Sequence, residues 1–284
     1  MGAPCELQIF AENQLLAKHC AKTVIADVLR LESKYSRYKA DSYLCSINQA
    51  ALNGGEFSVD EETAALLDYA DTCYQQSDGL FDISSGILGQ VWKFPDNQRP
   101  NAAQIQALLE RVGWEKISWL KPILKFNRAG MAIDFGGIVK EYAADRTASV
   151  CHEMGVFHGV INLGGDIRII GSRPNHEPWR IGIQHPRSAN ESVPSLSLSQ
   201  GAVATSGDYA RFMIVNGKRY GHILNPKTGW PVSYLASATV VADLCIIAGS
   251  ASTIALLKEQ QGAQWLESLG LFHICYGING EKLC

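Results

Sequence analysis

Residues 132–145 read Ala-Ile-Asp-Phe-Gly-Gly-Ile-Val-Lys-Glu-Tyr-Ala-Ala-Asp and join an apolar run to helix-forming residues through two glycines. Gly136 and Gly137 let a ligand approach the main chain closely, because they have no Cβ. A helix that begins there presents unpaired N–H groups to an anion, and Lys140 would add a positive charge about one turn later. Asp134 could accept a hydrogen bond or hold a metal. An ordinary strand-to-helix turn explains the same pattern, since no phosphate-loop motif is present.

The periodicity of apolar residues predicts a mixture of helices and strands along the chain. Apolar residues recur every three or four positions over 12–34, which indicates one face of a helix. Strands are predicted over 117–126, 131–135 and 196–203, and the last leads into a loop at 204–209. Because there is no internal repeat or linker, the sequence predicts one compact α+β module over residues 1–284, with mixed sheets and flanking helices in one or two lobes.

Composition excludes several classes of protein. The apolar share of 46% and the charged share of 19% are typical of a globular enzyme. A net charge of -3 without any run of Lys or Arg argues against a nucleic-acid partner. No apolar stretch approaches the roughly 20 residues of a membrane span, and no secretory signal is visible. We therefore expect a cytoplasmic protein as the chain stands, or a periplasmic or inner-membrane one if a leader was removed.

Eight cysteines are spread along the sequence, and none forms a Cys-x-x-Cys pair. A structural zinc site is therefore not expected, and a disulfide scaffold is improbable at this length. Most of the cysteines stand in apolar patterns, as buried reduced thiols do. We interpret them as structural residues in a reducing compartment.

Several polar loops combine residue types that bind ligands, although each also has an ordinary structural explanation. Tyr38 could stack on a ring or pack half-buried against the core. Asp82 lies in a Gly- and Ser-rich loop that suits a pocket, or it merely binds backbone N–H groups. Thr205 and Ser206 suit phosphate contact, but equally a turn or a helix cap. His222 follows a strand end beside polar turn residues, where a histidine can act as a base near pH 7.

Taken in order, these segments resemble the ApbE family of FAD:protein FMN transferases. The three most specific motifs are Asn-Leu-Gly-Gly-Asp-Ile, Ala-Thr-Ser-Gly-Asp-Tyr and His-Ile-Leu-Asn-Pro-Lys-Thr-Gly-Trp-Pro. The matching segments cover nearly the whole chain, and they are 36–48, 78–94, 132–145, 161–171, 204–209 and 222–231. Each motif alone is weak, but their common order makes coincidence very improbable.

The resemblance implies an enzyme that cleaves FAD with the help of Mg²⁺. Such enzymes attach FMN to a Ser or Thr hydroxyl of a target protein through a phosphoester and release AMP. The implied partner is a flavoprotein subunit of a respiratory electron-transport complex. Charge neutralisation on the phosphates and a positioned hydroxyl are the physical requirements of this reaction.

The resemblance also implies roles for individual residues. His222 matches the histidine needed for transfer, as a base toward the acceptor hydroxyl or as a phosphate contact. The backbone carbonyl of Gly137 matches a metal ligand. The positions that match FAD contacts, together with the two hydroxyl residues assigned above to phosphate contact, are Met1, Tyr38, Leu80, Phe81, Asp82, Asp134, Lys140, Thr205 and Ser206.

The chain departs from the family pattern at the expected metal site. The late helix of the family opens with Ala-Asp-x-x-x-Thr, whose Asp and Thr hold magnesium, and this chain keeps Thr253 but has Gly249 in place of the Asp. Glu141 stands where a glycine is usual and is predicted to supply the missing carboxylate; a glutamate on a solvated helix face explains it equally well.

The departure leaves three hypotheses open. The first is an active flavin transferase. The second is a metal-poor relative that hydrolyses FAD to FMN and AMP or only binds FAD. The third is an interaction protein that reuses the fold, and the retained polar loops argue against it.

Overall fold

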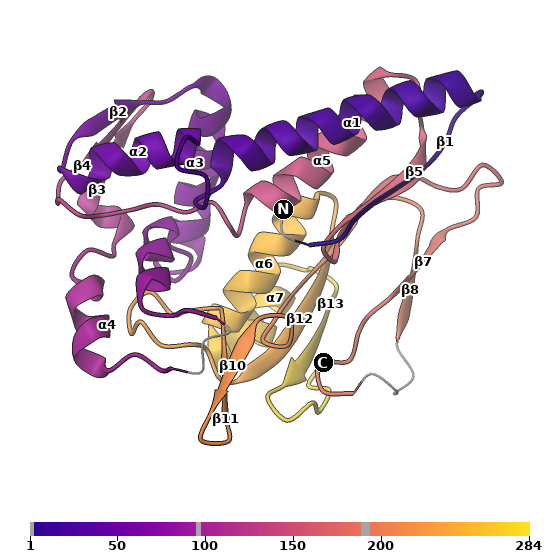
Figure 1. The fold of residues 1–284 in the computed structure, drawn as a ribbon. Coiled ribbons are helices and arrows are strands. Elements are labelled where there is room, and N and C mark those ends of the chain that lie inside the picture. The colour runs from indigo at the N-terminus through magenta and orange to yellow at the C-terminus, as the bar shows by residue number, and fades with distance from the viewer. Residues whose placement is uncertain (1–2, 95–97, 189–193) are drawn as a thin grey trace.

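The computed structural model describes residues 3–94, 98–188 and 194–284, and its largest sheet is six-stranded in the order β1-β5-β6-β9-β12-β13 (Figure 1). Every neighbouring pair in this sheet is antiparallel. Its strands are β1 Cys5–Phe10, β5 His158–Leu163, β6 Asp166–Gly171, β9 Ala202–Gly207, β12 Leu235–Ala242 and β13 His273–Gly277.

Helices cover one face of this sheet. The strongly apolar α6 (Cys245–Leu257) packs on β9 and β12, and α5 (Val139–Glu153) packs on β5 and β6. The long α1 (Gln14–Tyr35) lies over α5, while α7 (Gly262–Ser268) follows α6 toward β13 (Figure 1). Small residues such as Ala248, Ala251 and Ala255 let α6 approach the strands closely.

A two-stranded ribbon covers part of the other face. Strands β7 (Trp179–Gly182) and β8 (Ser195–Leu198) pair with each other and place Trp179 and Ile181 against Ile169 and Val203 of the main sheet. Alternate residues of β9 therefore face α6 or this ribbon, as the pleat of a strand requires.

A second lobe lies on the far side of α5 and α6 from this ribbon (Figure 1). It contains a three-stranded sheet, three α-helices and a 3-10 helix: β2 Glu56–Ser58, β3 Ile117–Leu120, β4 Ile123–Phe126, α2 Tyr43–Leu52, α3 Glu61–Gln76, α4 Ala102–Leu109 and η1 Ile83–Gln90. The remaining described elements are short: η2 Trp114–Lys116, η3 Glu259–Gln261 and the hairpin of β10 Phe212–Val215 with β11 Lys218–Gly221. The predicted α+β architecture of mixed sheets and flanking helices in two lobes is confirmed.

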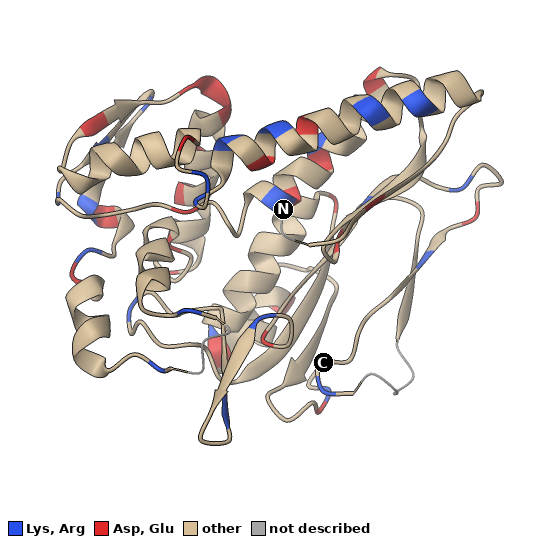
Figure 2. Ribbon diagram, viewed as in Figure 1, with Lys and Arg blue, Asp and Glu red and all other residues tan. Residues whose placement is uncertain are grey.

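The long helix α1 joins the two lobes. Its Arg30 and Lys34 both bind Glu62 of α3, at distances of 2.8 and 2.7 Å. Figure 2 shows positive and negative residues interspersed along α1 rather than gathered by sign. Among the helices built from described residues, none combines the length and hydropathy that crossing a bilayer requires.

Two strand predictions were wrong. Residues 131–135 form no strand, and within the described residues they pair with none. Instead, the amide side chain of Asn48 binds both the N–H and the C=O of Ile133, at 2.8 and 3.0 Å. The predicted strand 117–126 is the hairpin of β3 and β4, which turns at Lys121 and Pro122. The local sequence pattern indicated strands in both segments, but it showed neither the turn within 117–126 nor the pairing of 131–135 with a side chain instead of a strand.

The predicted strand over 196–203 was also wrong, because it merges two strands that lie in different sheets. β8 ends at Leu198 and β9 begins at Ala202, and Gly201 between them has a φ of +86°. A side chain at Gly201 would meet the carbonyl oxygen of Ala242 at 2.9 Å. As a result, 204–207 lie inside a strand rather than in a loop.

The carboxylate of Asp145 fixes the register of α5 against α6. Its two oxygens accept hydrogen bonds from the backbone N–H groups of Cys245 and Ile246, at 2.8 and 2.9 Å. Arg168 of β6 lies 3.1 Å from the same carboxylate. Asp145 thereby caps a helix that has no capping side chain of its own.

Replacing Asp145 by Ala should lower the free energy of unfolding by about 2 kcal/mol, because it removes the cap of α6 and leaves the half-buried Arg168 without its carboxylate. Urea denaturation followed by circular dichroism measures this loss. Glu153→Ala, at an exposed position of the same helix, should change stability little. Equal effects of the two substitutions would contradict the assigned role.

Candidate active site

The start of α5 carries a cation between two carboxylates. The Lys140 ammonium forms an ion pair with Asp166, which is nearly fully buried at the start of β6. Burial opposes the charge of Lys140, but the neighbouring Asp166 and Glu141 outweigh it, so the pKa of Lys140 lies above its ordinary value. The first turn of α5 therefore presents a fixed positive charge. The N–H groups of Gly136, Ile138 and Val139 already donate to Asp134 and to the Phe135 carbonyl.

Glu141 is buried and faces α6. A Cβ on Gly249 would lie 2.4 Å from its Cγ, so the glutamate side chain occupies the space above this glycine. Among the described residues, its Oε2 is buried without a hydrogen-bond partner. Burial, and then the charge of Asp166, raise the pKa of Glu141 to about 8. The prediction of a glutamate on a solvated helix face is thus wrong.

Hydroxyl groups from β9 and α6 meet beside this glutamate. The Ser206 Oγ lies 2.8 Å from Thr253 Oγ1 and 2.8 Å from Ser252 Oγ. Thr253 stands one helical turn after Gly249 and so shares its face of α6. The structure therefore brings Glu141, Ser206 and Thr253 to one place.

Thr205 is not part of this group. It precedes Ser206 in β9 and points to the opposite face of the sheet, where its Oγ1 lies 2.8 Å from Thr239 Oγ1. The prediction that both neighbouring hydroxyls contact one phosphate assumed a loop, and a strand cannot aim both side chains the same way. We correct the site accordingly and keep Ser206.

The loop at 80–82 packs against the glycine turn. The Phe81 ring lies 3.4 Å from where a Cβ on Gly137 would be, and Leu80 packs half-buried against the same core. Both oxygens of Asp82 accept backbone N–H groups, those of Ser84 and Trp114, at 2.8 and 3.0 Å. Asp82 therefore binds backbone N–H groups, which is the structural alternative given in the sequence analysis. Contact between its carboxylate and FAD stays a prediction.

Tyr38 and Asp134 come together through Arg37. The Arg37 guanidinium lies 2.8 Å from an Asp134 oxygen and 2.9 Å from the Tyr38 hydroxyl. The second Asp134 oxygen accepts the N–H of Gly136 at 2.9 Å. The Tyr38 side chain is 74% exposed and accessible to a planar ligand. Met1, the remaining predicted flavin contact, lies outside the described residues.

His222 follows directly after β11. Gly221 passes so close to Asp208 that a Cβ there would lie 2.8 Å from the Cβ of the aspartate. The His222 Nδ1 lies 3.2 Å from the carbonyl oxygen of Arg211, which can only accept, so Nδ1 carries the proton and Nε2 keeps a lone pair. Burial, and then the charge of Arg211, lower the pKa of His222 below its ordinary value. The imidazole is therefore neutral at pH 7 and able to take a proton.

Electrostatic interactions connect these groups into one site. The charge of Lys140 contributes to lowering the pKa of His222 and opposes the raised pKa of Tyr209. The charge of Arg211 contributes to lowering the pKa of both His222 and Tyr38. The structure thus adds Arg37, Asp166 and Arg211 to the predicted residues. Only Asp166 had a sequence signal, because it follows the Gly164-Gly165 pair; the two arginines resemble any surface arginine in sequence.

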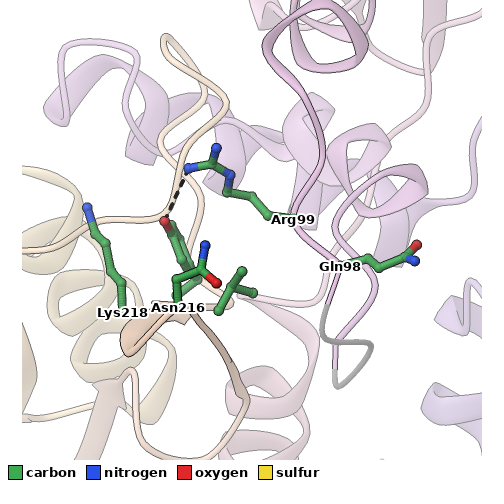
Figure 3. A pocket seen from close by; sticks show the side chains of 6 residues that line it. Gln98, Arg99, Asn216 and Lys218 are labelled. Atoms are coloured by element: carbon green, nitrogen blue, oxygen red, sulfur yellow. Dashed lines mark hydrogen bonds between the residues drawn. The ribbon is translucent and has the colours of Figure 1, made fainter.

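A hollow beside the β10–β11 hairpin is lined by Gln98, Arg99, Val215, Asn216, Lys218 and Tyr220 (Figure 3). None of these is a predicted site residue. Arg99 lies 5.6 Å from the Trp230 ring centroid and Lys218 5.5 Å from that of Tyr220, so aromatic rings hold both cations. The group around Lys140 and His222 is therefore the stronger candidate for chemistry.

The sequence description of the ApbE family matches residues 1–274. The chain belongs to the ApbE family. An FAD:protein FMN transferase of Haemophilus influenzae is 28% identical over 273 residues, which are 91% of this chain and 78% of the relative. The corresponding protein of Salmonella typhimurium is 29% identical over 260 residues, covering 87% and 74%.

Solved structures of the family have the same fold. The crystal structure of the ApbE protein of Thermotoga maritima superimposes with a TM-score of 0.88 at 28% identity and covers 97% of this chain and 92% of its own. The apo flavinyl transferase ApbE of Pseudomonas stutzeri gives 0.87 at 25% identity, with coverages of 98% and 88%. The fold predicted from the resemblance is confirmed.

The residues around Glu141 fit a hard divalent cation. In the part of the chain that the structure describes, no group donates a hydrogen bond to the Oε2 of Glu141. Burial of a carboxylate oxygen in this way is costly unless a cation compensates it. Hydroxyl and carbonyl oxygens such as those of Thr253 and Gly137 are the ligands that Mg²⁺ accepts beside a carboxylate.

In the absence of divalent ions, Glu141→Gln should make the protein's stability less sensitive to pH. The unfolded chain releases the Glu141 proton near pH 4.5 but the folded chain holds it to about pH 8. Between these values folding retains a proton that the unfolded state has lost, so wild-type stability falls relative to the variant as pH rises. Denaturant titrations across this range measure the difference.

Glu153→Gln, at an exposed position of the same helix, is the control and should run parallel to wild type. A wild-type curve that rises relative to Glu141→Gln between pH 4.5 and pH 8 would contradict the assignment of a buried, uncompensated carboxyl.

Proposed function

We propose that this chain is an FAD:protein FMN transferase. The observation that carries the proposal is that Lys140, at the start of α5, acts electrostatically on His222, whose pKa lies below its ordinary value. The hydroxyls of Ser206, Ser252 and Thr253 lie together between β9 and α6. These groups come from segments distant in sequence, and the family resemblance implies roles in the same reaction for His222, Lys140 and Thr253. The names of the relatives support the same activity.

The reaction exchanges the phosphoanhydride linkage of FAD for a phosphoester linkage to the acceptor. The hydroxyl oxygen of the acceptor Ser or Thr bonds to the FMN phosphorus, the bond from that phosphorus to the bridging oxygen breaks, and AMP leaves with the bridging oxygen. The acceptor hydroxyl proton passes to the free Nε2 of His222. The Lys140 ammonium stabilises charge on the phosphate oxygens.

The two ends of FAD have separate contacts in this proposal. The exposed Tyr38 ring stacks on a planar ring, while Asp134 and its partner Arg37 bind polar atoms on the adenosine side. Leu80 and Phe81 contact FAD next to the glycine turn, and Met1 contributes on the flavin side as the resemblance implies. Ser206 binds a phosphate oxygen through its hydroxyl.

Mg²⁺ would be held by the Glu141 carboxylate, the Gly137 carbonyl and the Thr253 hydroxyl. Once bound, it would neutralise charge on the pyrophosphate. The distinctive feature of this chain is that the carboxylate comes from α5 instead of α6, and Gly249 provides the room for it. The acceptor in this proposal is a flavoprotein subunit of a respiratory electron-transport complex.

A second activity is hydrolysis of FAD to FMN and AMP, with water in place of the acceptor hydroxyl, or FAD binding without cleavage. The observation that favours it is Gly249 at the position of the family's metal-binding Asp. The same assay separates the alternatives, because transfer labels the acceptor and hydrolysis releases free FMN.

Incubation of the purified chain with FAD, Mg²⁺ and a Ser/Thr-containing acceptor fragment should add the mass of FMN to the acceptor and release AMP in equal amount. His222→Ala should slow transfer by about 100-fold or more, because the proton acceptor is lost, and should retain FAD binding. Mass spectrometry and FAD titration measure the two effects. His19→Ala, at an exposed histidine of α1, is the control; unchanged transfer in His222→Ala would refute the role of His222.

A carboxylate placed on α6 at position 249 should be able to replace the Glu141 carboxylate of α5 in the proposed magnesium site. Glu141→Gly should weaken Mg²⁺ binding about tenfold or more, and the double variant Glu141→Gly with Gly249→Asp should restore it, because the new aspartate enters the space that the glutamate vacates. Isothermal titration with Mg²⁺ in the presence of FAD measures binding without activity. Gly249→Asp alone should fail to tighten binding, since its Cβ collides with Glu141. Equal Mg²⁺ affinity in wild type and Glu141→Gly would exclude Glu141 as a ligand.

A further inference from the structure

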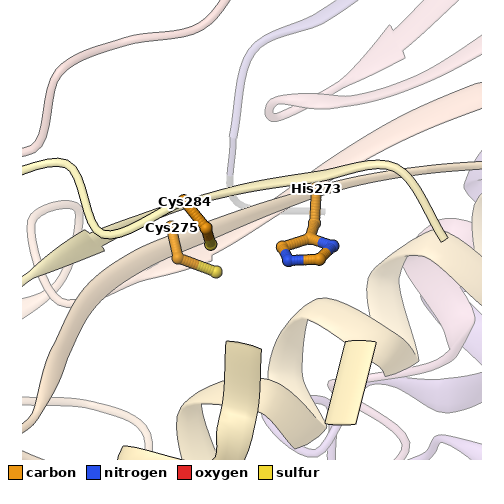
Figure 4. Close-up of side chains that lie close together, drawn as sticks. All are labelled: His273, Cys275 and Cys284. Carbon is orange, nitrogen blue, oxygen red and sulfur yellow. The ribbon is translucent and has the colours of Figure 1, made fainter. Parts of the chain in front are cut away.

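Three side chains able to bind a metal lie together at β13, on the edge strand of the main sheet. They are His273, Cys275 and Cys284, and their ligand atoms all lie within 4.8 Å of one another. Figure 4 shows the His273 ring and the two sulfurs turned toward a common space next to helical segments. None of the three belongs to the site around His222.

Strand pairing brings these residues together. His273 and Cys275 are two positions apart in β13 and so point to the same face. The following segment turns back and pairs with β13: the Leu283 N–H donates to the Cys275 carbonyl at 2.9 Å, and the Cys275 N–H donates to the Cys284 carbonyl at 3.2 Å. The thiol of Cys284 is thereby placed beside that of Cys275. A search for Cys-x-x-Cys pairs finds only ligands that are close in sequence, and it misses this arrangement.

The hydrogen bonding of His273 prepares it to bind a cation. Its Nδ1 lies 2.8 Å from the backbone carbonyl of Leu271, which can only accept a hydrogen bond, so Nδ1 carries the proton. The lone pair is then on Nε2. A backbone carbonyl that fixes the tautomer in this way is the usual second partner of a metal-binding histidine.

We propose that His273, Cys275 and Cys284 bind one zinc-class divalent cation. Two thiolates and one imidazole are soft to borderline ligands, which select Zn²⁺ over Mg²⁺ and complete three of its four tetrahedral positions, leaving the fourth to water. Ligand atoms around Zn²⁺ lie roughly 3.5 to 3.8 Å apart, so small side-chain rotations complete the site. Binding releases the two thiol protons to solvent.

The proposed ion would fasten the last residues of the chain to the main sheet. Cys275 lies opposite Ala238 of β12, which in turn lies opposite Ser206 of β9. Cys275 and Ser206 therefore occupy one row of the sheet and point to the same face, with about 10 Å between their backbones. The ion would stabilise the edge of the sheet whose inner strand β9 carries Ser206, one of the three clustered hydroxyl residues of the candidate site.

Cobalt substitution tests the proposal with the full chain. After removal of metals by a chelator and reduction of thiols, one equivalent of Co²⁺ should produce thiolate-to-cobalt absorption and tetrahedral ligand-field bands, and Zn²⁺ should displace it. Cys284→Ser, at an exposed position that should not disturb folding, should weaken Zn²⁺ affinity at least tenfold in competition with a chromophoric chelator. His273→Gln should weaken it similarly.

Two controls make the result specific. Cys5→Ser removes an exposed thiol of β1, and Glu141→Gln removes the carboxylate of the proposed magnesium site; both should leave the cobalt spectrum and the Zn²⁺ affinity unchanged. Absence of thiolate-to-cobalt absorption in wild type, or identical spectra in wild type and Cys284→Ser, would overturn the proposal.

Discussion

The bond between the Asp145 carboxylate and the first two N–H groups of α6 is the constraint on which the candidate site depends. It sets the register of two helices that run in opposite directions, so Glu141, one turn before Asp145, meets Gly249, one turn after Cys245. A slip of one residue would move each side chain about 1.5 Å along the helix and rotate it by about 100°. The oxygen atoms gathered near Thr253 would then disperse.

Burial gives the same cluster its chemical character. Glu141 and Asp166 are both removed from water, yet only Lys140 stands between them as a cation among the described residues around them. Charge in such surroundings is stabilised by groups fixed in place rather than by solvent. His222, by contrast, stays neutral because the positive field of Arg211 adds to the effect of burial. The candidate site thus combines an excess of buried carboxylates with a histidine able to accept a proton.

Sequence patterns predicted the elements that are determined by residues adjacent in the sequence, and they missed the features that depend on partners distant in the sequence. The α6 helix and the hairpin at Asn216 and Gly217 followed from apolar spacing and turn chemistry. The family motifs located His222, Lys140 and Ser206. No local signal distinguished Thr205 from Ser206, because their separation arises from β9 pairing with β12. Arg37 and Arg211 were missed for the same reason: their roles come from the neighbours that the fold supplies.

The amide of Asn48 has a consequence for how the family can diversify. It replaces an entire strand partner, since it alone binds both backbone groups of Ile133 in the segment that carries Asp134. The segment is held by separate contacts, the Asn48 amide and a hydrogen bond from the Asp134 N–H to the Ile83 carbonyl at 2.9 Å. Separate contacts tolerate small displacements that a continuous ladder of strand hydrogen bonds would forbid. The segment that carries Asp134 can therefore shift in evolution while the six-stranded sheet stays unchanged, which offers a route to altered ligand preference without a change of fold.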